Sequence, residues 1–90
     1  RKPGKLSGGQ QQRVAVIRAV VGRPALVLAD EPTANLDSSA SESLLDMMYE
    51  LNRELNVTFV FATHDSRVMQ RARRLIRMVD GVIDSDERCR

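Results

Sequence analysis

Two short apolar runs, each followed at once by ionisable side chains, constrain the fold of this chain more than any other feature. The first run covers residues 25–29 and is followed by Asp30 and Glu31; the second covers residues 57–62 and is followed by Thr63 and His64. Continuous apolar runs of this length are typical of strands that are covered on both faces. Because helix-compatible segments precede and separate the runs, we expect the two strands to pair in parallel within an α/β sheet.

The segment before the first strand carries the signals of a helix that ends near Gly22. Ser7 and Gln10 have the spacing of a capping box, in which each residue satisfies a backbone N–H group of the other. Glycine followed by Arg23 and Pro24 is typical of a helix stop and a turn of the chain. The expected apolar face of this helix is formed by Val14, Ile17 and Val21.

A second helix is predicted between the two strands, over residues 39–55. Ser39 and Glu42 offer another capping box, and Asn56 is suited to end the helix. The expected apolar stripe consists of Leu44, Met48, Leu51 and Leu55. A helix in this place would provide the right-handed crossover that connects two parallel strands.

Downstream of the second strand, Asp65 can cap a short helix that contains Val68. Residues 75–79 are a candidate third strand, and Asp80 followed by Gly81 is a strong signal for a hairpin turn into residues 82–83. The order strand, helix, strand, helix, strand predicts parallel pairing of all three strands with right-handed crossovers. The expected fold is therefore α/β, with a parallel sheet, flanking helices and a C-terminal β-hairpin.

Composition narrows the class of protein. The chain has 90 residues, of which 42% are hydrophobic and 29% charged, as in ordinary globular proteins. Its net charge of +2 is too small to argue for nucleic-acid binding, so basic clusters at residues 1–5 and 67–77 are interpreted as solvated faces.

The single Cys89 permits no internal disulfide, which favours a reducing cytoplasm. No apolar run approaches the roughly 20 residues of a membrane-spanning helix. The abrupt start at Arg1 leads us to expect a piece of a longer protein.

The ionisable ends of the two strands predict a ligand site. Ligands of open parallel sheets bind beyond the carboxyl ends of the strands. Asp30, Glu31 and His64 are therefore expected together along this edge of the sheet, which we call the rim. One carboxylate could join the oxygen shell of a Mg²⁺ ion while its neighbour polarises an attacking water. The alternative is a set of exposed loop side chains, because a lone histidine after a strand is more often a packed or surface imidazole.

A second candidate site lies at the start of the first helix. Paired glycines, Gly8 and Gly9, allow the backbone to approach a ligand closely, and the free N–H groups of a helix start favour an anion. Ser7 adds a hydroxyl donor. The alternative is a simple helix cap with permissive glycines, and a lone Ser-Gly-Gly does not decide between the two.

Taken together, four motifs resemble those of the ATPase subunits of ABC transporters. They are Leu6-Ser7-Gly8-Gly9-Gln10, the stretch from Ala25 to Thr33, Asn35-Leu36-Asp37, and Thr63-His64-Asp65. They occur in the family's order and at about its spacing, and the likeness covers nearly the whole chain. Residues 10–13 and 63–81 look most like the branch that serves lipoprotein release and macrolide-type export. The resemblance implies the C-terminal part of a P-loop NTPase sheet, with residues 1–90 as the C-terminal portion of an ABC ATP-binding domain.

The resemblance also implies a role for each matching residue. Asp30 matches the Walker B aspartate on the Mg²⁺ shell, Glu31 the catalytic base, and His64 the switch histidine at the γ-phosphate. The signature residues, which contact the γ-phosphate of ATP held by the opposite subunit, are Ser7, Gly8, Gly9 and Gln10. Asn35 and Asp37 match the D-loop, which communicates across the dimer, and Ala34 stands before it where relatives often have glycine.

The same resemblance implies partners and a location. It predicts ATP and Mg²⁺ as ligands, a second ATPase subunit in a head-to-tail dimer across ATP, a transmembrane permease, no nucleic acid, and a place on the cytoplasmic face of the membrane. No Gly-x-x-x-x-Gly-Lys-[Ser/Thr] phosphate loop occurs in the sequence. We therefore expect the 90 residues alone to hydrolyse ATP negligibly and to self-associate through exposed strand edges and apolar surface.

Two other functions remain open from the sequence. An ATPase of DNA repair, chromosome maintenance or the ribosome could share the signature loop, although no coiled-coil or tandem insertion is visible. A regulatory or binding module could use the rim as an anion pocket without catalysis. ATP affinity and turnover separate the last possibility from the enzymes.

Overall fold

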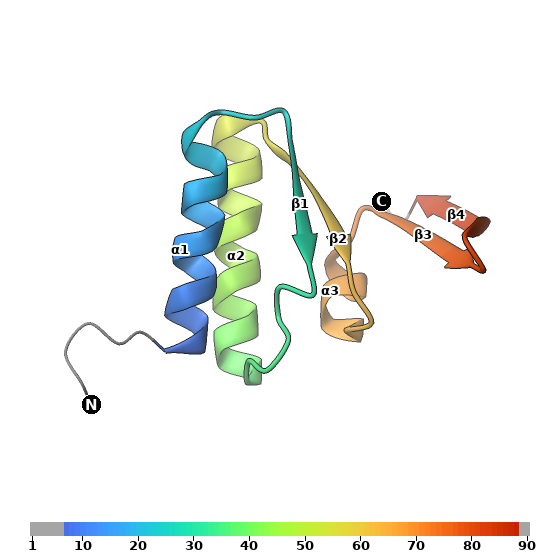
Figure 1. Ribbon diagram of the computed structural model, residues 1–90, viewed down its shortest axis with the longest axis horizontal. Helices are drawn as coiled ribbons and strands as arrows, with labels where there is room; N and C mark the ends of the chain where they lie inside the picture. The colour runs from blue at the N-terminus through green and yellow to red at the C-terminus, as the bar shows by residue number, and fades with distance from the viewer. Residues whose placement is uncertain (1–6, 89–90) are drawn as a thin grey trace.

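The computed structural model describes residues 7–88 (Figure 1). The predictions that concern the basic cluster at residues 1–5, Leu6 and Cys89 lie outside these residues. In chain order the elements are α1 (Gly8–Val21), β1 (Leu26–Asp30), α2 (Ser38–Leu55), β2 (Thr58–Ala62), α3 (Ser66–Arg71), β3 (Arg74–Val79) and β4 (Val82–Arg88). This order of helices and strands confirms the predicted α/β class.

The strands form two separate pairs. β1 and β2 pair in parallel, with Leu26 opposite Thr58 and Asp30 opposite Ala62, as the helix between them predicts. β3 and β4 form an antiparallel hairpin away from this sheet (Figure 1). The hairpin confirms the predicted turn. The expectation that the third strand continues the parallel pairing is wrong, because β3 takes its hydrogen-bond partner from the strand that directly follows it.

Both long helices pack on the same face of the parallel pair. α1 and α2 lie side by side in Figure 1, and Val16 of α1 meets Leu44 and Met48 of α2 in the core. The sheet contributes side chains of alternate residues, Ala29, Phe59 and Phe61. A side-chain period of two sends these to one face of the strands. None of the described helices is long and apolar enough to cross a membrane.

The opposite face of the parallel pair is open within the described residues. Leu26, Leu28 and Val60 are 52%, 75% and 46% exposed. The prediction that both strands are covered on both faces is therefore wrong within these residues, whereas the expected exposure of apolar surface is confirmed. The physical reason is that the two helices that flank β1 in sequence both lie on the other side.

The apolar face of α1 also differs from its prediction. Val16 and Val20 are its buried residues, whereas the expected face is exposed: Val14 by 37%, Ile17 by 48% and Val21 by 72%. The helix has apolar residues on more than one side, so periodicity alone did not decide which side meets α2. Of the buried i, i+4 pair, Val16 packs against Leu44 and Met48, which fixes the side of the helix that faces α2.

Helix boundaries follow the capping signals with one correction. Gln10 N donates to Ser7 Oγ over 3.1 Å and Ser7 N donates to Gln10 Oε1 over 3.0 Å, which confirms the first capping box. The start of α2 is instead capped by Asp37, whose Oδ1 accepts from Ala40 N at 2.7 Å. The predicted cap at Ser39 is wrong because this carboxylate lies two residues earlier and already satisfies the free amide. Asn56, with φ 56°, ends α2 as predicted.

The short helix α3 is fastened to α2 by an arginine. Arg71 donates to Glu42 Oε2 over 3.2 Å and to Asp46 Oδ1 over 2.8 Å. Val68 of the same helix is 3% exposed. Asp65 caps α3 as predicted. The loop between β2 and α3, which carries His64, is therefore anchored at both ends.

Candidate functional site

The carboxyl end of the parallel sheet turns sharply at Glu31. Its backbone N–H donates to Ala62 O over 2.8 Å, which extends the parallel ladder one residue beyond β1. Its φ is 46°, in the left-handed region that costs a non-glycine residue about 1–2 kcal/mol. Residues held in this way gather at functional sites, where surrounding contacts enforce the conformation. The turn aims the Glu31 side chain along the rim instead of continuing the strand.

Glu31 and His64 meet at this rim. His64 Nδ1 lies 3.0 Å from Glu31 Oε1, and Thr63 Oγ1 donates to Glu31 Oε2 over 3.3 Å. The parallel register places Asp30 opposite Ala62, so the residues that follow each strand arrive together. The structure thus brings Glu31 and His64 into contact, as their position after neighbouring strands predicts.

The pair faces outward. The His64 side chain is 100% exposed and that of Glu31 is 39% exposed. When Nδ1 carries the proton that is donated to Glu31, the other ring nitrogen points away from the carboxylate and is available to a ligand. Each oxygen of Glu31 keeps a lone pair beyond the bonds to Thr63 and His64. The arrangement offers a carboxylate acceptor and an imidazole side by side on an accessible surface.

Asp30 lies next to this pair in sequence but does not join its hydrogen bonds. It ends β1 with its side chain exposed and, together with Gln12, lines a cavity of about 150 Å³ between α1 and β1. No group of three or more potential metal ligands occurs among the residues that the structure describes. A Mg²⁺ ion commonly takes only one or two carboxylates, with waters and substrate phosphates supplying the rest. A single available carboxylate fits a partial shell of that kind.

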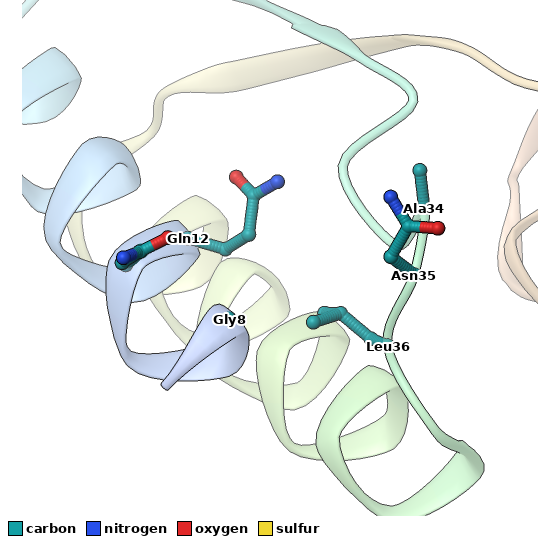
Figure 2. Close-up of a pocket in the computed structure, with 6 residues that line it drawn as sticks. Gly8, Gln12, Ala34, Asn35 and Leu36 are labelled. Atoms are coloured by element: carbon teal, nitrogen blue, oxygen red, sulfur yellow. The ribbon is translucent and has the colours of Figure 1, made fainter. Parts of the chain in front are cut away.

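The candidate anion site at the start of α1 forms a second, separate group. A pocket of about 370 Å³ has Gly8 and Gln12 of α1 on one wall, and Ala34, Asn35 and Leu36 on the other (Figure 2). A Cβ atom added at Gly8 would lie 3.4 Å from Leu36 Cδ2. The pocket brings Gly8 of the predicted signature motif to Asn35 of the predicted D-loop, whereas Ser7, Gly9 and Gln10 are not among the residues that line it, and neither are Glu31 and His64.

Backbone geometry explains the loop beside this pocket. Asn35 has φ 65°, a conformation that asparagine tolerates better than most residues. Ala34 does not have a positive φ, so the alanine at this position is compatible with the turn. Asp37 uses a carboxylate oxygen to cap α2. Of the two predicted D-loop residues, Asn35 therefore borders the pocket and Asp37 is occupied in holding the helix.

A further group of residues beside the rim was missed by the sequence analysis. Thr33 Oγ1 donates to Asp65 Oδ2 over 2.6 Å, and the Arg67 guanidinium donates to both oxygens of the same carboxylate. These hydrogen bonds, the one from Arg67 first, hold the pKa of Asp65 far below its usual range. The sequence indicated Asp65 as a helix cap and as the last residue of the Thr63-His64-Asp65 motif, without a partner. The available signal was its place beside the histidine, together with a threonine after the acidic pair.

Comparisons with known proteins agree with this geometry. Residues 1–34 match the family model described as ABC transporter. The chain is 53% identical over 85 residues to the macrolide export ATP-binding/permease protein MacB of Syntrophobacter fumaroxidans, covering 94% of this chain and 12% of that protein. It is 47% identical over 83 residues to the lipoprotein-releasing system ATP-binding protein LolD of Francisella tularensis, covering 92% of this chain and 36% of that protein.

Solved structures give the same result at the level of the fold. A dimeric ATP-binding cassette in a post-hydrolysis state, bound to ADP and Pi, superposes with a TM-score of 0.81 at 43% identity and covers 100% of this chain. A nucleotide-free cassette superposes with a TM-score of 0.87 at 29% identity. The chain spans 39% and 35% of these two structures. These 90 residues belong to the ABC transporter family, as part of one of its ATP-binding subunits.

Proposed function

We propose that the subunit to which these residues belong hydrolyses ATP, with Glu31 as the general base and His64 as the contact to the γ-phosphate. The contact of 3.0 Å between the two side chains, at the carboxyl ends of paired parallel strands, carries this proposal. Ligands of open parallel sheets lie at this edge. The similarity to a cassette solved with ADP and Pi supports a nucleoside triphosphate as the substrate.

The chemistry of the pair suits attack by water on a phosphoryl group. Glu31 accepts a proton from water as the oxygen bonds to phosphorus, and the bond to the leaving ADP oxygen breaks, which gives ADP and Pi. Glu31 holds His64 through Nδ1; with both ring nitrogens protonated, Nε2 can donate to an oxygen of the transferred group, where negative charge accumulates. Bound Mg²⁺ supplies charge neutralisation, and Asp30 is the residue of this chain that would contribute to its shell.

The separate pocket at the start of α1 is proposed to serve a second nucleotide. Of the signature residues Ser7, Gly8, Gly9 and Gln10, Gly8 lines a pocket with Asn35 and not with Glu31, which suits an ATP molecule held by another subunit. Ser7 Oγ accepts from Gln10 N, which leaves its hydroxyl hydrogen for a phosphate oxygen. The dimeric state of a similar cassette supports a second subunit, which the proposal places head to tail with the first.

We further propose that this activity is coupled to transport by a membrane permease. The names of the MacB and LolD relatives support export or lipoprotein release. The proposal places the subunit at the cytoplasmic face of the membrane. They favour this function over an ATPase of DNA repair or translation. Residues 1–90 would form the C-terminal portion of the ATP-binding domain, and its remaining part would supply the phosphate loop.

The decisive experiment replaces the base in the full-length subunit. Glu31→Gln keeps the shape of the side chain and its contact to Thr63 but removes proton acceptance, so turnover should fall at least about 100-fold while ATP binding is retained. Glu54→Gln, at an exposed position of α2, is the matched control and should keep normal turnover. Wild-type turnover in Glu31→Gln would remove Glu31 from the role of base.

A second variant tests the pocket at the start of α1. Ser7→Arg places a bulky cation where the proposed partner nucleotide lies, so ATP-dependent dimerisation should weaken while the monomer still binds ATP. Size-exclusion chromatography with ATP, in the Glu31→Gln background that prevents turnover, measures the dimer. Normal dimerisation in this variant would contradict the proposed contact across the dimer.

A further inference from the structure

The hydrogen bond between His64 and Glu31 is too weak to explain by itself how the imidazole is oriented at the rim. The His64 side chain is 100% exposed, and its hydrogen bond to Glu31 is surrounded by solvent. Exposed pairs of this kind stabilise one side-chain geometry only slightly, because water competes and the side chains lose freedom. A catalytic arrangement must hold its groups close to the productive geometry. The loops that carry the two side chains must therefore be fixed by other contacts.

The strongest link between these loops is the hydrogen bond from Thr33 to Asp65. Thr33 follows Glu31 by two residues, and Asp65 directly follows His64. The distance between Thr33 Oγ1 and Asp65 Oδ2 is 2.6 Å, and Thr33 is 1% exposed. Water is thus kept from the hydroxyl, and a short bond to a charged acceptor is among the stronger hydrogen bonds in proteins.

Besides Thr33, two other residues hold Asp65 in place, Arg67 and Thr63. Arg67 donates from Nε to Oδ1 and from Nη2 to Oδ2, over 3.0 Å and 2.7 Å, and its backbone N–H donates to Oδ1 over 2.9 Å. The Asp65 backbone N–H donates to Thr63 Oγ1 over 2.9 Å, and that hydroxyl donates to Glu31 Oε2 over 3.3 Å. The loop after β1 and the loop after β2 are therefore linked at two places, one on each side of His64.

We propose that Thr33 and Asp65 are positioning residues, which set the relative aim of Glu31 and His64 by locking the two loops together. Their polar groups are used within this link: the Thr33 hydroxyl donates its only hydrogen to Asp65, and both Asp65 oxygens accept from Arg67 or Thr33. Neither side chain needs to touch nucleotide. This inference rests on the proposed ATPase activity of the same rim.

The test uses the full-length subunit and separates turnover from binding. Thr33→Val removes the hydroxyl at nearly constant shape, and Asp65→Asn removes the charge. Each should lower kcat about 10-fold with the KM for ATP changed less than about 2-fold. Because both break the same link, the double variant should lose no more than the worse single variant. Thr33→Ser, which keeps the hydroxyl, should recover kcat to within about 2-fold of wild type.

Matched controls lie away from the link. Thr58→Val changes an exposed threonine at the opposite end of β2, and Asp84→Asn changes an exposed aspartate of β4; both should keep normal kcat. The proposal is overturned if Thr33→Val keeps normal kcat, or if the two losses multiply to about 100-fold in the double variant. A loss of kcat that Thr33→Ser does not recover would also overturn it.

A second readout distinguishes this proposal from the ATPase activity itself. If the wild-type subunit hydrolyses ATP and Glu31→Gln does not, the proposed function stands whatever Thr33→Val does. If the wild-type subunit shows no turnover, the proposed function fails. In that case the effect of the Thr33–Asp65 link on His64 is measured by NMR. The imidazole ¹⁵N signals of His64 are assigned by their loss in His64→Gln. Thr33→Val should move them toward the values of a free histidine, and unchanged signals would overturn the inference.

Discussion

The parallel pair β1–β2 is stabilised by packing against a buried core, whereas the hairpin β3–β4 depends on contacts between strands that are close in sequence. The parallel pair has its strands joined through the long helix α2 and packs Phe59 and Phe61 against a core that includes Leu44 and Met48, both at most 2% exposed. The hairpin has no buried residue along its described strands. Its strands are instead joined by a two-residue turn, in which Asp80 and Gly81 have φ of 51° and 77°.

This difference shows why the candidate site lies where it does. A parallel pair needs a covering layer and a long connection, and these bring distant residues such as Glu31 and His64 to one edge. A hairpin brings together only near neighbours in the chain, here Arg74 and Asp86, whose atoms approach to 2.9 Å and 2.6 Å. Long-range contacts therefore build the site, and local contacts build the hairpin.

The largest expected effect is on the core beneath the parallel pair. Leu44→Ala in the full-length subunit removes a side chain that is 0% exposed, so the free energy of unfolding should fall by about 2–5 kcal/mol. Met78→Ala in the hairpin, at a position 60% exposed, should cost less than about 1 kcal/mol. Urea denaturation measures both. Equal losses in the two variants would break the contrast between the regions.

The open face of the parallel pair should drive self-association of the 90-residue chain. Leu28→Thr combined with Val60→Thr removes apolar side chains from this face and places a strand-compatible, β-branched residue at both positions, so the dissociation constant should rise about 10-fold, or about 1.4 kcal/mol. Ile76→Thr combined with Val82→Thr is the matched change on the hairpin and should have little effect. Light scattering measures the outcome, and a monomeric wild-type chain of native stability would contradict it.

A smaller effect is expected at the hairpin turn. Gly81→Ala forces a side chain onto a residue with φ 77°, which should cost about 1 kcal/mol. Because the hairpin shares no strand with the parallel sheet, amides of β3 and β4 should exchange with solvent about 5-fold faster while those of β1 and β2 are unchanged. Faster exchange in β1 would show that the two regions unfold together. Asp80→Asn, which tolerates the same backbone conformation, is the control.

The smallest expected effects are those of pH on the stability of the two regions. Hydrogen bonds from Arg67 and Thr33 hold the pKa of Asp65 far below its usual range, and that from Arg74 lowers the pKa of Asp86. Because the pKa of each aspartate is lower in the folded than in the unfolded state, its ionised form stabilises the fold. This stabilisation is fully present above the ordinary pKa of aspartate and is lost as pH falls through each lowered pKa. Carboxyl NMR titration should show the larger shift at Asp65. Arg74→Gln should raise the pKa of Asp86 alone; a change at Asp65 would contradict their independence.

Elements and caps with local causes were predictable from the sequence. The apolar runs indicated the parallel pair, Ser7 and Gln10 indicated the first cap, and Asp80-Gly81 indicated the hairpin turn. The meeting of Glu31 and His64 was also predictable, because parallel strands deliver their carboxyl ends to one edge.

What the sequence did not decide depends on contacts between distant elements. The buried side of α1 is the one that meets α2 through Val16; Val20 lies on this side and is also buried, whereas Ile17 is exposed. The bond from Thr33 to Asp65 joins residues 32 positions apart, so it depends on how the loops after β1 and β2 meet. Coverage of the second sheet face likewise depends on what packs there, which the apolar character of Leu28 could not specify.

The left-handed backbone at Glu31 has a consequence for protein engineering. A glycine there would adopt φ 46° without the steric penalty, so selection for heat resistance alone should drift toward glycine or asparagine at this position. Such variants would be more robust and would have no carboxylate to accept a proton. Thermostability screens on this subunit should therefore hold this codon constant, since the improvement easiest to find removes the group proposed to activate water.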